Sequence, residues 1–291
     1  MGECVNIIYV NFERNPVQTD TKLTDTGRDS FFPVSDFSPN GFKKIRLGGL
    51  AIAVSTRDEA AKYLVHSALH RRAGAKPLFV TSANGQVLSM CARDPEIRAL
   101  FDQADLIHAD GQPMVVASRR YCSNPLPERV ATTDLFHDIA KVAESWGASF
   151  YVLGASEAVN ARATSNIKAM YPLLNIAGRR NGYFSADEEL DIVRKINALK
   201  PDILWVSLGA PLEQQFVCRN ISKLTNVGVI KTAGGLLDFV AGKRKRAPKW
   251  MQDWSLEWLY RTWLEPTRLG PRYLETNMHS ARLLATQSGD L

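Results

Sequence analysis

The sequence has few cysteines, and none of them stands in a metal-binding or redox pattern. Its four cysteines lie far apart, with no CxxC pair and no histidine at ligand spacing. No apolar run reaches the roughly 18 to 20 residues that a membrane-spanning helix needs, and the N-terminus lacks a basic stretch followed by a long apolar one. These absences predict a cytoplasmic protein with reduced thiols, neither exported nor integral to a membrane.

The fingerprint of dinucleotide-binding enzymes is missing as well. It requires Gly-x-Gly-x-x-Gly after the first strand and an acidic residue about 20 positions later, whereas Gly154-Ala155-Ser156 is only a fragment of it. A nicotinamide-dependent oxidoreductase is therefore disfavoured. Internal repeats are absent too. Residues 1–43 are rich in Thr, Asp, Ser, Asn and Pro, which predicts a poorly ordered leader that carries no chemistry.

Positive charge is concentrated near the C-terminus. The formal net charge is +6, and many of the basic residues fall in one stretch: Lys243, Arg244, Lys245, Arg246, Lys249, Arg261, Arg268 and Arg272. This local patch predicts an anionic partner, although nothing in the sequence points to nucleic acid. In the same stretch, Trp254, Trp258 and Trp263 recur at helical spacing, which predicts one side of an amphipathic helix. The alternative is a C-terminal helix packed on its own core with a solvated basic face.

From Ile45 onward, short apolar runs alternate with helical patterns, which is typical of an α/β protein with a mostly parallel sheet. The expected strands are 77–83, 106–109, 149–153, 174–177, 203–208 and 228–232. The expected helices are 86–93, 95–104, 113–120, 134–146, 158–171, 187–199 and 213–224. The sequence thus predicts a Rossmann-like core over 44–242 with helices on both faces of the sheet, followed by an amphipathic helical appendage over 243–291.

The segments at the ends of the expected strands, or directly after them, are polar or contain glycine. They are Ser82-Ala83-Asn84, Asp110-Gly111, Gly154-Ala155-Ser156, Gly209-Ala210-Pro211 and Ala233-Gly234-Gly235. Because ligands bind outside the carboxyl ends of the strands in open α/β sheets, these segments predict one shared crevice. Pro211 suits the start of the following helix, where free backbone N–H groups can hold an anion.

Two aspartates are candidates for chemistry at this crevice. Asp110 follows a strand directly, so its carboxylate is held rigidly while Gly111 permits close approach of a ligand. The alternative is that Asp110 caps the helix beginning near Pro113. Asp134 either contacts a ligand or lies in the first turn of a helix capped by Thr132 or Thr133. The residues alone leave both questions open.

Several motifs together resemble those of the WecG/TagA/CpsF glycosyltransferase family. Near the C-terminus they are Gly235, Asp238-Phe239, Ala241-Gly242, Arg246-Ala247-Pro248, Leu256-Glu257-Trp258-Leu259-Tyr260-Arg261, Glu265-Pro266, Arg268-Leu269 and Arg272-Tyr273. Upstream, Ser82-Ala83-Asn84, Ala109-Asp110-Gly111 and the segments 129–135 and 209–214 match the remaining motifs. The chain departs from the family pattern at Ser82, Ala131, Thr132, Leu212, Glu213, Gln214 and Pro271.

The resemblance implies an inverting glycosyltransferase that moves a hexose, an N-acetylhexosamine or a uronic-acid relative from a UDP-sugar to a polyprenyl-diphosphate-linked glycan. It makes Asp110 the catalytic base. Together with the strand ends, it assigns substrate contacts to Ser82, Asn84, Gly111, Asp134, Gly154, Gly209, Pro211, Glu213, Gln214, Arg261, Arg268 and Arg272. It also implies a peripheral location on the inner face of the plasma membrane, with Trp254, Trp258, Trp263 and Lys249 against the anionic surface.

No cofactor is expected. Many sugar-nucleotide transferases hold a metal ion through Asp-x-Asp, and this tripeptide does not occur in the chain. Helix N-termini and guanidinium groups are therefore expected to offset the charge of the leaving diphosphate. The main alternative to an enzyme is a peripheral membrane scaffold, which leaves the row of polar strand ends unexplained. The donor sugar, the acceptor glycan and the presence of a homo-oligomer stay open.

Overall fold

The computed structural model describes residues 41–291 except 72, 73, 245, 249, 252–255 and 265, and it does not describe the side chains of 261, 268, 269 and 271–274. Most of the expected leader therefore lies outside the described residues. Two of the expected membrane-contacting residues, Trp254 and Lys249, also lie outside them. Residues Phe42 to Leu291 form one compact unit.

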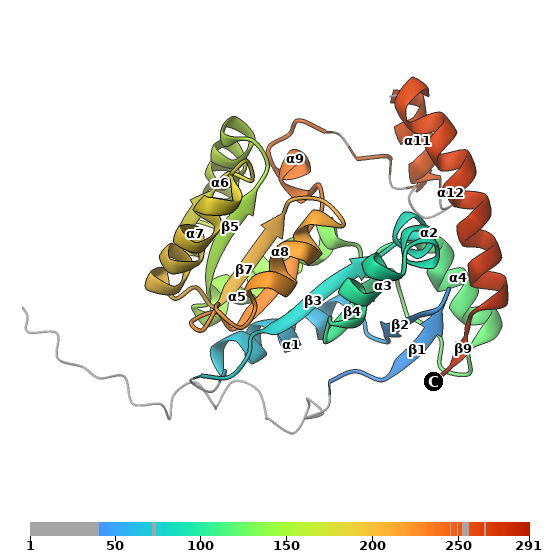
Figure 1. Ribbon diagram of the computed structural model, residues 1–291, viewed down its shortest axis with the longest axis horizontal. Helices are drawn as coiled ribbons and strands as arrows, with labels where there is room; N and C mark the ends of the chain where they lie inside the picture. The colour runs from blue at the N-terminus through green and yellow to red at the C-terminus, as the bar shows by residue number, and fades with distance from the viewer. Residues whose placement is uncertain (1–40, 72–73, 245, 249, 252–255, 265) are drawn as a thin grey trace, which may run out of the picture. The chain divides into compact units, whose positions relative to one another are not determined.

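A six-stranded sheet forms the centre of this unit (Figure 1). Its strands are β3 (Leu78–Ala83), β4 (Leu106–Ala109), β5 (Ser149–Gly154), β6 (Asn175–Arg180), β7 (Ile203–Ser207) and β8 (Val229–Thr232), in the order β4-β3-β8-β7-β5-β6. All neighbouring pairs are parallel. Every residue of β5, β7 and β8 is buried, as parallel strands covered on both faces require. The six strands predicted from the apolar runs are confirmed, with small shifts at their ends.

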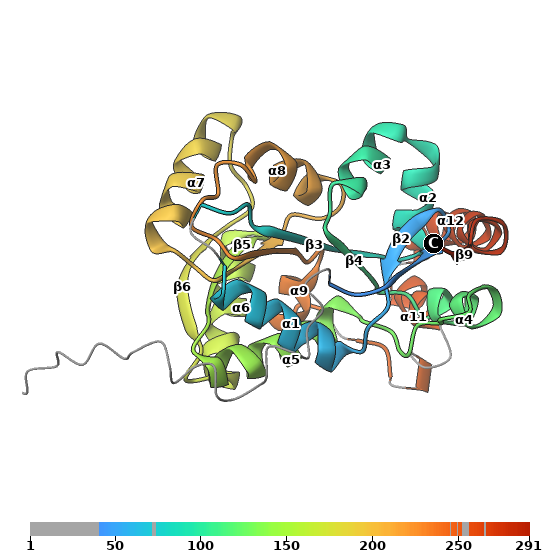
Figure 2. The ribbon, with the colours of Figure 1, turned by 90° about the horizontal axis from the view of Figure 1, so that it is seen from below.

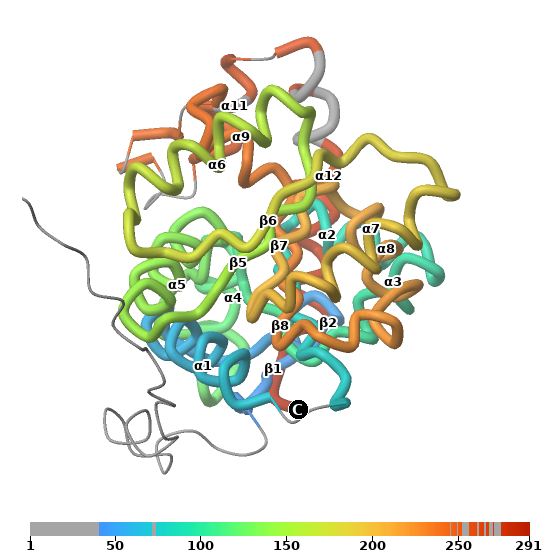
Figure 3. The backbone as a smooth tube through the Cα atoms, turned by 90° about the vertical axis from the view of Figure 1, so that its left-hand side faces the viewer, coloured from blue at the N-terminus to red at the C-terminus, as the bar shows by residue number. Residues whose placement is uncertain are grey.

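Helices cover both faces of the sheet, as predicted (Figure 2). On one face lie α1 (Arg57–Leu69), α5 (Thr132–Trp146), α6 (Glu157–Met170) and α9 (Leu236–Val240), and on the other lie α2 (Gly85–Arg93), α3 (Pro95–Asp102), α7 (Ala186–Leu199) and α8 (Leu212–Asn220). Figure 3 shows the same division, with α1 and α5 on the opposite side of the strands from α7 and α8. Along β5, Phe150 and Val152 belong to an apolar cluster with residues of α1, α5 and α6, whereas Tyr151 and Leu153 belong to another with residues of α7 and α8.

A second, three-stranded sheet connects the start of the described chain to its end. Strand β1 (Lys44–Leu47) pairs antiparallel with β2 (Leu50–Ala53) and with β9 (Gly289–Asp290). Helix α12 (Pro266–Thr286) leads into β9, and it packs against α2 and α4 (Gln112–Tyr121) (Figure 1). Its Leu283 and Leu284 are buried in an apolar cluster with residues of β1 and β2.

The C-terminal segment is thus joined to the core by a strand as well as by helix packing, and the boundaries expected at 43 and 243 stay predictions. Helix α11 (Glu257–Leu264) precedes α12 and contacts it. Within the described ranges, no helix is both long and apolar enough to cross a membrane.

Candidate active site

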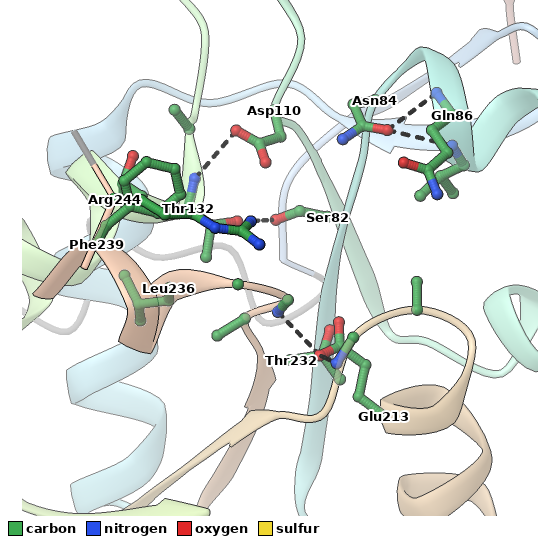
Figure 4. A pocket seen from close by; sticks show the side chains of 18 of the residues that line it. Ser82, Asn84, Gln86, Asp110, Thr132, Glu213, Thr232, Leu236, Phe239 and Arg244 are labelled. Carbon is green, nitrogen blue, oxygen red and sulfur yellow. Dashed lines mark hydrogen bonds between the residues drawn. The ribbon is translucent and has the colours of Figure 1, made fainter. Parts of the chain in front are cut away.

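A polar cavity lies at the carboxyl edge of the large sheet. Its volume is about 310 Å³, and its lining includes Ser82, Asn84, Asp110, Thr132, Gly209, Glu213, Thr232, Arg244, Arg246 and Glu257. These residues come from the ends of four strands, from the starts of α2, α5 and α8, and from the C-terminal segment. Figure 4 shows that Ser82, Asp110, Thr132 and Glu213 face the same space. Four of the five strand-end segments predicted to share a crevice therefore line this cavity, and the fifth, Gly154-Ala155-Ser156, does not.

Asp110 is held in place by two main-chain contacts (Figure 4). Its own N–H donates to the Ala83 carbonyl at 2.8 Å, which fixes it to the end of β3. One of its carboxylate oxygens accepts the Thr132 N–H at 3.3 Å. The N-cap of α4 is Gly111, without a side-chain hydrogen bond. The alternative in which Asp110 caps this helix is therefore wrong, and its carboxylate is turned to the cavity instead.

The surroundings of Asp110 favour its neutral form. Burial raises the pKa of Asp110 above its ordinary value; the charge of Arg129 lowers it, Glu257 raises it further, and Lys231 together with the Thr132 N–H lowers it. Because desolvation is the largest of these influences, the ionised carboxylate is a stronger base than an aspartate in water.

A smaller cavity of about 170 Å³ adjoins the first. The two share Asn84, Gln86, Asp110 and Glu257, and the lining of the smaller one also includes Gly111, Arg129 and Trp258. The side-chain oxygen of Asn84 caps α2 by accepting the N–H groups of Gln86 and Val87 at 3.0 and 3.2 Å. Its amide nitrogen faces Asp110 (Figure 4). Asp110 therefore borders two spaces rather than one.

The start of α8 differs from its expected role in anion binding. One carboxylate oxygen of Glu213 accepts the Gly209 N–H at 3.1 Å and the Gly234 N–H at 2.9 Å. Burial raises the pKa of Glu213, while these N–H groups and Lys231 act in the opposite direction. Glu213 thus joins the loops after β7 and β8. Free backbone N–H groups were expected near this helix start to hold an anion; the Gly209 N–H is not one of them, because the carboxylate of Glu213 occupies it.

Three other expected site residues line neither of the two cavities just described. Pro211 is the N-cap residue of α8. Gln214 is buried, and its amide donates to the Thr81 hydroxyl at 3.0 Å. Gly154 has a φ of +137°, and a Cβ there would lie 2.2 Å from the Ser207 carbonyl oxygen, so this glycine permits the close packing of β5 on β7.

Asp134 is the centre of an ion-pair cluster. It lies in the first turn of α5, as expected, but the N-cap is Ala131 and not a threonine. Its carboxylate forms a close hydrogen-bonded ion pair with Arg246 and lies 3.6 Å from Arg57 and 3.7 Å from Arg129. Asp134 does not itself line the larger cavity described above, but Arg246 does. It therefore positions a cation at the cavity and ties the C-terminal segment to α5.

The arginines singled out in the sequence lie on α11 and α12, where the side chains of Arg261, Arg268 and Arg272 are outside the described ones. Among the side chains that the structure describes, Arg244 and Arg246 are the cations that line the larger cavity. Both belong to the basic run from which the sequence predicted an anionic partner.

Two further charged residues were missed. Arg129 pairs with Glu257 of α11 at 3.2 Å, and Lys231 is fully buried in β8. A lysine inside the apolar run of a central strand is an unusual signal that the sequence did offer. Among the residues the structure describes, no group of three or more His, Cys, Asp or Glu side chains is arranged to hold a metal ion.

The doubly covered parallel sheet and the polar cavity at its carboxyl edge define a Rossmann-like α/β enzyme. The chain matches the model of the Glycosyl transferase WecG/TagA/CpsF family over residues 45–290. It belongs to this family, and it is a glycosyltransferase.

Similar proteins include three from Staphylococcus aureus, strains MRSA252, NCTC 8325 and COL. Each is 29% identical over 193 residues, which cover 66% of this chain and 74% of the relative. Each is named N-acetylglucosaminyldiphosphoundecaprenol N-acetyl-beta-D-mannosaminyltransferase. A scaffold without catalysis is thereby disfavoured.

Proposed function

We propose that this protein is an inverting glycosyltransferase that moves a sugar from a UDP-sugar to a polyprenyl-diphosphate-linked glycan. The observation that carries the proposal is the position of Asp110, a partly buried carboxylate that borders two adjoining polar cavities. A transferase needs one space for the donor and another for the acceptor, with a base where the two meet.

In this proposal the larger cavity takes the UDP-sugar, because Arg244 and Arg246 line it and can bind a diphosphate. The smaller cavity takes the acceptor sugar. Asp110 accepts the proton of the acceptor hydroxyl as that oxygen attacks the anomeric carbon, and UDP leaves from the opposite face of the sugar. This single displacement inverts the anomeric configuration. A general base of this kind contributes about 10²–10⁴ in rate.

The names of the Staphylococcus aureus relatives suggest the first substrates to test. They indicate an N-acetylmannosamine donor and an acceptor in which N-acetylglucosamine is linked through a diphosphate to undecaprenol. The match is incomplete, since identity is 29%. The donor class is therefore kept as a hexose, an N-acetylhexosamine or a uronic-acid relative.

A polyprenyl-linked acceptor stays in the bilayer, so the proposal also places the enzyme peripherally on the inner face of the plasma membrane. The exposure of Trp263, which is 76% accessible on α11, supports this location, because tryptophan favours the membrane interface. Trp258, also on α11, lines the smaller cavity. In this arrangement, one helix contacts both the lipid surface and the acceptor.

The test is a panel of UDP-sugars, including UDP-N-acetylmannosamine, with N-acetylglucosaminyl-diphosphate acceptors carrying a short or a long polyprenyl chain. We expect acceptor-dependent UDP release with one donor class, and a product of inverted anomeric configuration by NMR. Retention of configuration would contradict the single displacement. Binding to anionic liposomes without UDP release from any donor would favour the scaffold instead.

We further propose that the reaction needs no metal, which is motivated by the missing Asp-x-Asp. EDTA should leave the rate of UDP release within about twofold of the untreated rate, because in this proposal guanidinium groups offset the charge of the diphosphate. Loss of activity on chelation, with recovery on addition of Mg²⁺ or Mn²⁺, would overturn this part of the proposal without affecting the rest.

A further inference from the structure

A buried lysine next to the larger cavity has no role in the reaction as just described. Lys231 lies on β8, a central strand of the sheet, and none of its surface is accessible. Its ammonium group donates to the Ser82 hydroxyl oxygen at 2.9 Å and to the Thr232 carbonyl at 2.8 Å. Burying an ammonium group carries a large desolvation cost. An apolar side chain would avoid that cost at this position.

The contact with Lys231 constrains the Ser82 hydroxyl. An ammonium group can only donate hydrogen bonds, so it always occupies one lone pair of the Ser82 oxygen. The Thr132 hydroxyl donates to the same oxygen at 3.0 Å (Figure 4). With both lone pairs occupied, the hydrogen of Ser82 is directed away from these two donors. Because Ser82 lines the larger cavity, its hydroxyl is left to donate into that space.

We propose that Lys231 is a positioning residue for sugar transfer, whose buried ammonium group holds the Ser82 hydroxyl as a hydrogen-bond donor toward a substrate oxygen in the cavity. The inference rests on the proposed function and deepens it, because it assigns a donor to the substrate and names the group that orients it. An oxygen of the sugar or of the diphosphate fits this donor equally well, since both are acceptors.

The charges around Lys231 explain why a cation is tolerated there. Burial lowers the pKa of Lys231 to about 8, while the facing carboxylates of Asp110 and Glu213 oppose this. His108, on β4 beyond the intervening strand β3, stays neutral because burial and the charge of Lys231 lower its pKa to about 3. As pH rises through about 8, the ammonium group therefore loses its charge.

This charge reaches Asp110 as well. Lys231 and Arg129 lower the pKa of Asp110, whereas burial and Glu257 raise it. Removing the Lys231 charge should raise the pKa of Asp110 further, so a higher pH is needed to ionise the base. Glu213 is held in addition by the N–H groups of Gly209 and Gly234, and these contacts do not depend on pH.

The experiment compares the full chain with Lys231→Met, a neutral side chain of similar length. We expect kcat/KM to fall about ten- to hundredfold, the effect of losing a hydrogen bond from a charged donor. The limb of the pH–rate profile near pH 8 should disappear, and the acidic limb should move to higher pH. The matched control is Lys195→Met, an exposed lysine on α7, which should keep the wild-type profile.

Substitutions of Ser82 test the same contact from its other end. Ser82→Ala should lower kcat/KM by a similar factor, and Ser82→Thr should recover most of the activity. At a pH where Asp110 is ionised in every variant, Lys231→Met combined with Ser82→Ala should cost no more than either change alone. If Lys231→Met fails to fold, as judged by its thermal transition, the Ser82 pair still decides. Wild-type rates for Ser82→Ala, or unchanged pH limbs in a folded Lys231→Met, would overturn the inference.

A readout without turnover separates this inference from the proposed function. In the chain labelled with ¹³C at the lysine ε-carbons, one resonance, absent in Lys231→Met, should titrate near pH 8, well below an ordinary lysine. The inference would be overturned if this resonance titrated at the same pH as the resonances of the other lysines. If wild type transfers no sugar from any donor, the proposed function fails, whatever the NMR titration gives.

Discussion

The substitution Asp110→Asn tests the catalytic assignment directly. The amide keeps an oxygen that can accept the Thr132 N–H, but it cannot take up the proton of an acceptor hydroxyl. Because general base catalysis is worth about 10²–10⁴ in rate, kcat should fall at least a hundredfold, while UDP affinity measured by calorimetry stays within a few-fold of wild type. The assay is UDP release with the donor that the panel identifies.

The same substitution should not destabilise the fold. The pKa of Asp110 is raised in the folded chain, so the folded state binds this proton more tightly than the unfolded state does. Its contribution to stability is fully present below the unfolded pKa near 3.8 and is lost as pH rises through the folded pKa. Above its folded pKa, ionised Asp110 therefore costs about 1.4 kcal/mol of unfolding free energy for each unit of its shift.

Asp110→Asn should thus melt at the same temperature as wild type or higher at pH 7, and the difference should vanish at low pH. The exposed Asp187 on α7 supplies the control, since Asp187→Asn should leave kcat unchanged. Turnover of Asp110→Asn near the wild-type rate would remove Asp110 as the base. A lowered melting temperature together with lost UDP affinity would mean that its role is structural.

Three other substitutions test the ion-pair cluster, the C-terminal helix and the exposed tryptophan. Asp134→Asn removes the ion pair that holds Arg246 at the larger cavity. It should lower kcat/KM about tenfold and weaken UDP binding measured by calorimetry. Unchanged UDP affinity would mean that Arg246 needs no ion-pair partner to bind UDP. Leu284→Ala should lower the unfolding free energy in urea by about 2–5 kcal/mol, whereas Leu291→Ala, at a residue 62% exposed, should leave it unchanged; equal effects would refute the packing of α12 on the core. Trp263→Ser should weaken binding to anionic liposomes at least about threefold, whereas Met278→Ser, at an exposed residue of α12, should bind like wild type. Equal binding by wild type and both variants would place the membrane contact elsewhere.

The strands of the large sheet could be predicted because their local sequence is distinctive. Strands such as β5 and β7 are buried at every position, so their sequences are continuous apolar runs bounded by glycine or polar residues. Helix α1 was missed because much of its buried face is alanine, at Ala60, Ala61 and Ala68. The capping box formed by Thr56 and Glu59 was the available signal.

The small sheet could not be predicted in the same way. Strand β9 has two residues, too few for any periodicity, and it exists only because β1 provides a partner from the far end of the chain. Pairing of this kind depends on tertiary structure and leaves almost no local pattern.

The site shows a similar division. Positions at strand ends, such as Ser82 and Asp110, follow from the architecture, so the sequence could place them at the cavity. The directions in which the side chains point could not be predicted in this way. Glu213 turns toward two backbone N–H groups and Gln214 turns toward a buried threonine, because neighbouring loops offer hydrogen-bond partners that no local pattern records.

The pairing of β1 with β9 has a consequence for how the chain folds during synthesis. Gly48 and its hydrogen-bond partner Ser288 are separated by 240 residues, so β1 emerges from the ribosome long before β9, its second neighbour, is made. Until then β1 presents an open edge, which is a site for aggregation. The yield of folded recombinant protein should therefore rise with added chaperones and with slow growth. A purification tag attached directly after Leu291 would lie next to β9, whose pairing with β1 completes the small sheet.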